Sequence, residues 1–197
     1  MKIVVLGPSG MVGSCIVTEL NARGHEVVGA SRASGTDVTD PAAVRAAASG
    51  ADAVVCATSA RGVDYTLADV ARSVVEGMRS AGTTRLLVVG GAGSLEVAPG
   101  VRLIDTPEFP EEHKAESAQG AEALAVYRDV GDLDWTFVSP AAYIHPGERT
   151  GRYRLGGDQL LRDANGNSEI SAEDYAIAIA DLIEQGSHGG ERVGVAW

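Results

Sequence analysis

The chain has 197 residues, of which 45% are hydrophobic and 22% charged, and its formal net charge is −11. This length and composition suit one domain, spanning 1–197, with a substantial core. The negative charge argues against a nucleic-acid surface, which would need a basic stripe, and is most simply explained by solubility.

Short apolar runs and amphipathic segments alternate from one end of the chain to the other. The apolar runs predict buried strands at 2–6, 26–30, 53–57, 85–89 and 135–138, with a closing strand at 192–196. Helical spacing predicts helices at 10–23, 41–49, 64–81 and 111–130 and a last helix after Ser171. This order predicts right-handed crossovers and therefore an α/β fold, a Rossmann-type doubly wound parallel sheet in three layers.

Two features of the C-terminal third refine this prediction. Ser171 reads as the N-cap of the last helix, and Asp174 stands at the capping-box position. Residues 141–170 read as irregular, with candidate short strands near Tyr153 and Leu160. Because this stretch is too long for an ordinary connection, we expect a substrate or lid segment there.

The first strand is followed by a glycine-rich loop, Gly7-Pro8-Ser9-Gly10-Met11-Val12-Gly13, which opens the first helix. Gly7 permits the tight turn, Gly10 permits close approach of a pyrophosphate, and Gly13 permits close packing of the helix. The free amides and dipole at the helix start favour negative charge. The spacing G-x-x-G-x-x-G in this strand–loop–helix context predicts a dinucleotide site that includes Ser9, Met11 and Val12.

The end of the second strand bears on the choice of dinucleotide. An NAD-selective domain usually has an acidic residue there, whereas this chain has Ser31-Arg32. A cation suits the 2′-phosphate of NADP, so we expect NADP(H), with NAD(H) also possible. Further expected contacts come from the loop after the second strand and from later strand ends: Asp37, Val38, Ala57, Thr58, Gly91, Ser139 and Pro140.

The glycine loop, Arg32, the Asp37-Val38-Thr39 step and the segments 90–95 and 135–140 together resemble the atypical short-chain dehydrogenase/reductases. Among these, the chain is similar to the compact NAD(P)H-binding group that includes NADH-flavin reductase, biliverdin-reductase-B-like and NmrA-like proteins. The resemblance covers nearly the whole chain and implies the fold and the cofactor. It leaves the reaction open, because the group mixes reductases, epimerases and cofactor-sensing regulators.

Typical short-chain dehydrogenases use a Tyr-x-x-x-Lys pair for acid–base chemistry. None of the five tyrosines here has a lysine four positions later, and the only lysines are Lys2 and Lys114. Ser94 matches the family's active-site serine in position, and His113 and Lys114 lie near where the pair would come, in a different arrangement. The catalytic candidates are therefore Ser94, His113, Lys114 and Tyr143.

The missing pair favours an electron-poor acceptor, such as a flavin or quinone, whose ring stabilises the added charge and needs less acid–base help. An epimerase, isomerase or ketoreductase that uses His113 or Tyr143 as a non-standard acid remains open. So does a regulator that senses NADP(H) without turnover.

The remaining expectations concern the surroundings of the protein. The two cysteines form no C-x-x-C or Cys/His cluster, so no metal or redox site is expected. No apolar run approaches the roughly 20 residues that cross a bilayer, and no leader pattern is apparent, so we expect the cytoplasm. We also expect a small-molecule substrate, neither nucleic acid nor membrane as a partner, and a monomer or homodimer.

Overall fold

The computed structural model describes all 197 residues and is built around a seven-stranded sheet. In their order across the sheet, the strands are β2 (Glu26–Ala30), β1 (Lys2–Leu6), β3 (Ala53–Cys56), β4 (Arg85–Val89), β7 (Asp134–Pro140), β11 (Glu191–Ala196) and β9 (Arg154–Gly156). All neighbours pair in parallel except β9, which joins the edge antiparallel to β11. The predicted parallel sheet is confirmed, and so is the closing strand.

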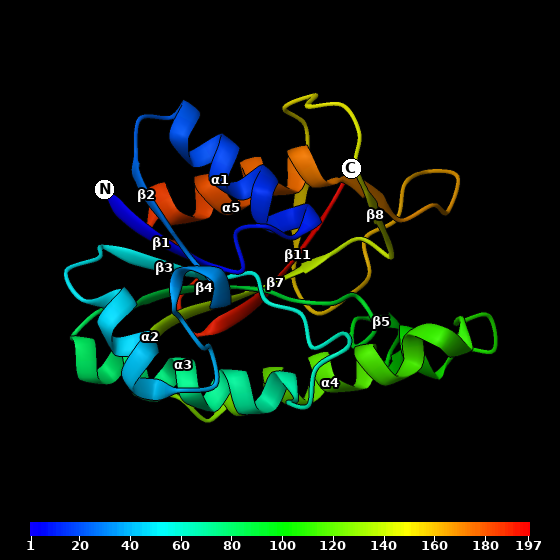
Figure 1. Ribbon diagram of the computed structural model, residues 1–197. Helices are drawn as coiled ribbons and strands as arrows, with labels where there is room; N and C mark the ends of the chain where they lie inside the picture. The colour runs from blue at the N-terminus through cyan, green and yellow to red at the C-terminus, as the bar shows by residue number, and fades with distance from the viewer.

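Helices cover both faces of the sheet (Figure 1). On one face lie α1 (Met11–Ala22) and α5 (Ala172–Gln185), and on the other lie α2 (Pro41–Ala48), α3 (Leu67–Ala81) and α4 (Glu111–Arg128). Successive residues of β1 enter opposite cores, since Ile3 packs with the α1/α5 side and Val4 with the α2/α3/α4 side. Burial on both faces explains why the strands read as continuous apolar runs, and the three-layer prediction is confirmed.

The strand order begins 2-1-3, the flavodoxin-like variant of the doubly wound sheet. Strand β2 pairs with one edge of β1 and strand β3 with the other edge. The connection after β1 and the connection after β2 therefore run in opposite directions across the sheet. Leu6 at the end of β1 is in register with Ala30 of β2 and Cys56 of β3. In sheets of this kind, ligands bind beyond the carboxyl ends of the strands at such a switch point.

The start of α3 and the cap of α5 each differ from the sequence prediction in one respect. Helix α3 begins at Leu67 rather than at residue 64, because Thr66 accepts from the Asp69 N–H while the Asp69 carboxylate accepts from the Thr66 N–H. For α5, Ser171 caps the helix as predicted. The predicted capping role of Asp174 is wrong, because its carboxylate instead accepts hydrogen bonds from Thr150, Gly151 and Trp197.

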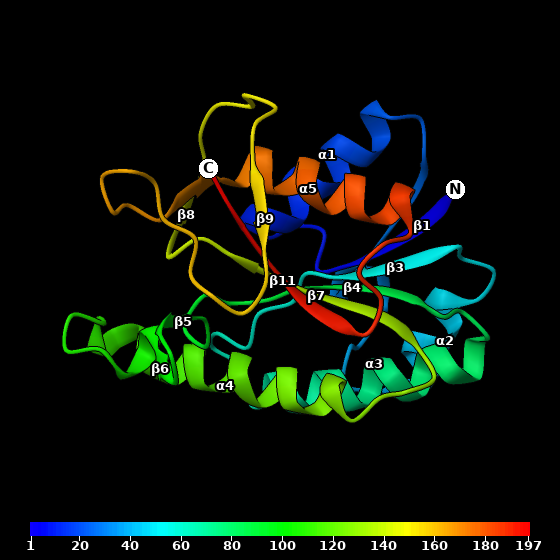
Figure 2. The same cartoon turned by 180° about the vertical axis from the view of Figure 1, so that it is seen from behind.

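The stretch 141–170 is more regular than expected. It contributes β8 (Tyr143–His145) and β9, and β8 pairs in parallel with β10 (Glu169–Ser171). Figure 2 shows β9 running beside β11 at the edge of the sheet. The candidate strand near Tyr153 is confirmed, whereas Leu160 lies beside a single bridge between Glu96 and Gln159. These strands have only three residues each, which is too few for an alternation of apolar and polar residues to be recognised in the sequence.

A second small region was absent from the prediction. Between β4 and α4 the chain forms a hairpin of β5 (Glu96–Ala98) and β6 (Val101–Arg102), followed by the short 3-10 helix η2 (Leu103–Asp105). Another 3-10 turn, η1 (Arg32–Ser34), follows β2. The hairpin and η2 lie between β4 and α4, and Leu103 of η2 lines the cavity described below.

Candidate active site

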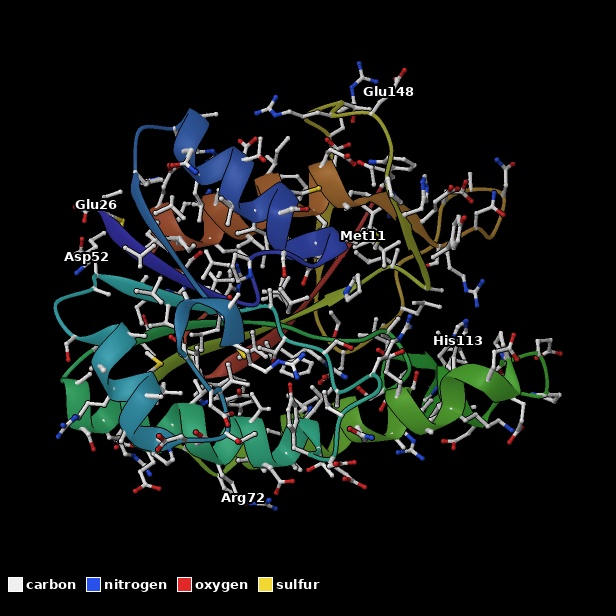
Figure 3. All side chains as sticks on the ribbon, viewed as in Figure 1. Met11, Glu26, Asp52, Arg72, His113 and Glu148 are labelled. Atoms are coloured by element: carbon white, nitrogen blue, oxygen red, sulfur yellow. The ribbon has the colours of Figure 1, made fainter.

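A cavity of about 760 Å³ lies at the carboxyl ends of the parallel strands. Its walls come from the start of α1, the loop after β3, the loop after β4, the first half of α4, and β8. Met11 and His113 lie at the same end of the sheet, on helices that cover its opposite faces (Figure 3). This volume is in the usual range for a small-molecule or cofactor site.

The glycine loop has the close contacts that its spacing predicted. Gly7 has a φ of +83°, and a Cβ there would lie 2.5 Å from the Ala57 carbonyl oxygen. A Cβ on Gly13 would lie 2.1 Å from the Gly7 carbonyl oxygen, so only glycine lets α1 start this close to the loop. At Gly10 a Cβ would meet nothing nearer than 3.8 Å, and this residue lines the cavity.

The first turn of α1 fits the phosphates of a dinucleotide. Gly10 is the N-cap residue and provides no side-chain cap, so the first amides of the helix have no partner within it. Three of these amides belong to residues that line the cavity, namely Met11, Val12 and Gly13. Backbone donors at a helix start, together with the helix dipole, form an anion site.

Other predicted cofactor residues fall into two groups. Those that line the cavity with the glycine loop are Ala57, Thr58, Gly91 and Pro140. Those that lie outside its lining are Gly7, Ser9, Ser31, Arg32, Asp37, Val38 and Ser139. Two in the second group are buried, since the Val38 side chain is packed in the core and Ser139 lies fully buried within the sheet, and their cofactor contacts stay predictions.

The end of β2 presents a free cation. Arg32 is exposed and forms no ion pair or side-chain hydrogen bond within the chain. Nearby, the N–H and hydroxyl of Thr39 both donate to Asp37 and lower the pKa of its carboxyl group, and the charge of Arg32 lowers this pKa further. Asp37 is therefore ionised and turned toward its own loop, while the guanidinium of Arg32 remains available for an anionic ligand.

Part of the cavity has an apolar and aromatic wall. The wall residues come from η2, from the segment before α4, from α4 itself and from β8: Leu103, Phe109, Pro110, His113, Tyr143 and Ile144. On the floor, burial raises the pKa of the Cys56 thiol and of the Tyr127 hydroxyl, so neither group ionises at neutral pH. This wall suits a flat, largely apolar molecule.

Of the four catalytic candidates, the structure brings His113 and Tyr143 to the cavity and leaves Ser94 and Lys114 outside its lining. The Ser94 hydroxyl accepts from Nη1 of Arg192, on β11, at 2.9 Å. Lys114 is one residue further along α4 than His113, so its side chain points elsewhere and pairs with Glu111 at 2.6 Å.

One pair of cavity residues was not anticipated. Nε of Arg61, in the loop after β3, donates to a carboxylate oxygen of Glu116 on α4 at 2.8 Å. Their separation of 55 residues gives no local signal for this contact. Phe109, by contrast, could have been noticed as one of only two phenylalanines, placed in an acidic segment.

The sequence model of the NAD(P)H-binding family matches residues 7–186, from the glycine loop through α5. The chain belongs to the NAD(P)H-binding family. The matched region includes every strand that borders the cavity and the whole of its lining. The family resemblance that the sequence motifs indicated is thus confirmed.

Three solved structures place the chain within this NAD(P)H-binding family more closely. A "putative exported protein" from Burkholderia pseudomallei is 46% identical with a TM-score of 0.93, and the match covers 100% of both chains. A "putative epimerase" from Bacteroides thetaiotaomicron is 38% identical with a TM-score of 0.91, covering 100% of this chain and 96% of that one. A "putative NADH-flavin reductase" from Streptococcus pneumoniae is 36% identical with a TM-score of 0.84, covering 100% and 99%.

Proposed function

We propose that this protein is an NAD(P)H-dependent oxidoreductase that reduces a flavin, a quinone or a similar conjugated acceptor, and that it prefers NADPH. The observation that carries the proposal is the composition of the cavity. The anion-binding start of α1 and the aromatic wall of Phe109 and Tyr143 share one space, and no lysine lines it. The similarity to the Streptococcus pneumoniae protein named for NADH-flavin reduction supports the same reaction.

The chain's own groups would then bind and align rather than transfer protons. The amides of Met11, Val12 and Gly13 hold the pyrophosphate, and Arg32 pairs with a 2′-phosphate. The cofactor supplies the hydride when it is bound. The apolar wall excludes water and stacks the acceptor ring, whose own electron deficiency stabilises the charge that it gains.

The direct test is NADPH oxidation, followed at its absorbance band with FMN, FAD, riboflavin and a small quinone offered in parallel. We expect turnover with at least one of them, and faster turnover with NADPH than with NADH. Tight NADPH binding without any turnover would contradict the reductase and favour a sensor of NADP(H).

A second candidate is an epimerase or ketoreductase. Both His113 and Tyr143 line the cavity, so it holds two groups that could exchange protons with a carbonyl or alcohol substrate. The Bacteroides thetaiotaomicron protein carries the name of this activity. Loss of all turnover in a Tyr143→Phe variant would favour this candidate, because phenylalanine keeps the ring and removes only the hydroxyl.

We further propose a small molecule as the substrate and the cytoplasm as the compartment, with the protein acting as a monomer or homodimer and without a nucleic-acid or membrane partner. The net charge of −11 supports the absence of a nucleic-acid surface. No helix is both long and apolar enough to cross a bilayer. The Burkholderia pseudomallei relative carries the name of an exported protein, so the compartment needs a test of its own. Fractionation of the native host would test it.

A further inference from the structure

Tyr143 is unusual among the large side chains of this protein because it is 61% exposed while lining the cavity. Its hydroxyl makes no hydrogen bond within the chain, so its position depends on the ring and the backbone. The backbone is fixed, since the Tyr143 N–H donates to the Ser168 carbonyl at 3.0 Å and β8 pairs with β10. An exposed aromatic ring on a rigid strand at a cavity mouth is a surface prepared for a ligand.

The ring of Tyr143 rests against the imidazole of His145. Their centroids are 4.8 Å apart and their planes differ by 26°, which is a stacked arrangement. His145 does not line the cavity, so it supports Tyr143 from the side away from the ligand space. The imidazole therefore limits how far the tyrosine ring can turn.

His145 is itself held at both ring nitrogens. Nδ1 lies 2.9 Å from the Pro146 carbonyl oxygen, and Nε2 lies 2.8 Å from a carboxylate oxygen of Glu169. Both ring nitrogens of His145 therefore lie within hydrogen-bond distance of an oxygen atom. Two contacts on opposite sides of the ring fix the plane of the imidazole against the face of Tyr143.

The C-terminal residue completes this support. Trp197 meets the His145 ring edge-on at a centroid distance of 6.0 Å, and its N–H donates to the Glu169 carbonyl at 3.0 Å. The indole Nε1 donates to the fully buried Asp174 at 2.7 Å. The strand pair β8/β10 is thus tied to the start of α5 through Trp197.

We propose that Tyr143 is the stacking wall for the planar ring of the acceptor, and that His145, held between Glu169 and the Pro146 carbonyl, is the residue that positions this wall. The inference rests on the proposed reductase function and assigns its acceptor side. In this proposal Tyr143 binds the acceptor ring by stacking and does not donate a proton. It also assigns a function to a histidine that touches neither cofactor nor acceptor.

The test uses full-length variants at saturating NADPH, with riboflavin and a small quinone as acceptors. Tyr143→Phe keeps the ring and should retain most of the acceptor binding that Tyr143→Leu loses. Tyr143→Leu should raise the acceptor KM about tenfold, the scale of one aromatic stack, with NADPH binding unchanged. His145→Leu should raise the acceptor KM several-fold, and His145→Gln, which keeps a donor toward Glu169, should recover part of that loss.

A matched control is His25→Gln, because His25 pairs with Glu184 at 2.9 Å in the same way but outside the cavity lining. It should leave the acceptor KM unchanged. The same variants are compared by equilibrium riboflavin binding with NADP⁺ present, read from flavin fluorescence, which requires no turnover. Thermal denaturation of each variant shows whether it is folded.

Each outcome decides between the two proposals. Suppose that the wild type turns over an acceptor and that Tyr143→Leu has the same acceptor KM and the same riboflavin affinity. The proposed stacking role of Tyr143 is then wrong, whereas the proposed reductase function is supported. A Tyr143→Phe variant that loses kcat at unchanged KM overturns the wall in favour of an acid. If the wild type turns over nothing, the reductase fails, and riboflavin binding alone decides the wall: equal binding by wild type and Tyr143→Leu, or none by either, overturns it.

Discussion

The two ends of the cavity are built in different ways. At the cofactor end, seven consecutive residues from Gly7 to Gly13 provide the turn, the close packing and the free amides, and backbone atoms make the site. At the proposed acceptor end, the wall is assembled from η2, α4 and β8, and side chains make the surface. The first end is encoded locally, whereas the second depends on segments about 40 residues apart, such as Leu103 and Tyr143.

This difference has a functional consequence. A backbone site tolerates changes in most side chains around it, so the same loop can hold a dinucleotide in proteins with different reactions. A side-chain wall changes with each substitution in it. Relatives named as an epimerase and as a flavin reductase, both more than 35% identical to this chain, are consistent with one shared end and one variable end.

The largest effect is expected from Gly13→Ala, because it attacks the backbone site itself. The added Cβ would lie 2.1 Å from the Gly7 carbonyl oxygen, a backbone atom that cannot move without distorting the turn. We expect loss of measurable NADPH binding and a destabilisation of about 1–3 kcal/mol, the usual scale of overpacking. Fluorescence titration with NADPH and chemical denaturation would measure the two effects.

Gly10→Ala is the matched control for that variant. A Cβ at Gly10 has no neighbour within 3.8 Å, so stability should stay near wild type while the methyl group weakens NADPH binding. If both variants lost stability equally, the packing role assigned to Gly13 would be wrong. Such a result would also contradict the view that backbone packing shapes the cofactor end whereas side chains shape the opposite wall.

The fold was predictable because its evidence is local. Apolar runs such as Lys2–Leu6 and Arg85–Val89 coincide with the strands, and caps such as Asp40 with Pro41 mark the start of α2. The hairpin 96–102 and the strand pair β8/β10 were missed or underestimated. Their strands have two or three residues, and long-range contacts such as Leu160 N–H to the Glu96 carbonyl hold them in place.

The site was likewise predictable only where its residues follow local sequence patterns. The positions of Gly7, Gly13 and Thr58 followed from strand ends, which sequence periodicity locates well. Ser94 was expected at the reacting end by its place after β4, but Arg192, almost a hundred residues later, engages its hydroxyl. Nothing in the sequence near residue 94 indicates that partner, so the acceptor side needed the structure.

A smaller effect is expected at the end of β2, where Arg32 is proposed to select the cofactor. Arg32→Ala should weaken NADPH binding by about 1–3 kcal/mol, the scale of a charge-assisted contact, and leave NADH binding nearly unchanged. Arg45→Ala is the control, since Arg45 is also exposed and free of ion pairs but lies in the last turn of α2. Equal losses for NADPH and NADH in Arg32→Ala would contradict the NADP preference.

The smallest effect concerns the tie between the segment 141–170 and α1. Arg149 donates to both carboxylate oxygens of Glu19 at 2.8 and 2.9 Å, and Arg23 donates to it as well. These bonds, that of Arg149 first, lower the pKa of Glu19 in the folded protein. A lowered pKa contributes stability that is complete above the ordinary value of 4.5 and is lost as the pH falls through the lower folded value.

Glu19→Gln should therefore reduce the free energy of unfolding by about 1 kcal/mol at neutral pH, because the pair is partly exposed. The gap between variant and wild type should close in acid, below a pH of 4.5. Urea denaturation across this range measures it, with Glu122→Gln on exposed α4 as a control that shows no such gap. A gap that stays constant with pH would mean that Glu19 acts through packing and not through its charge.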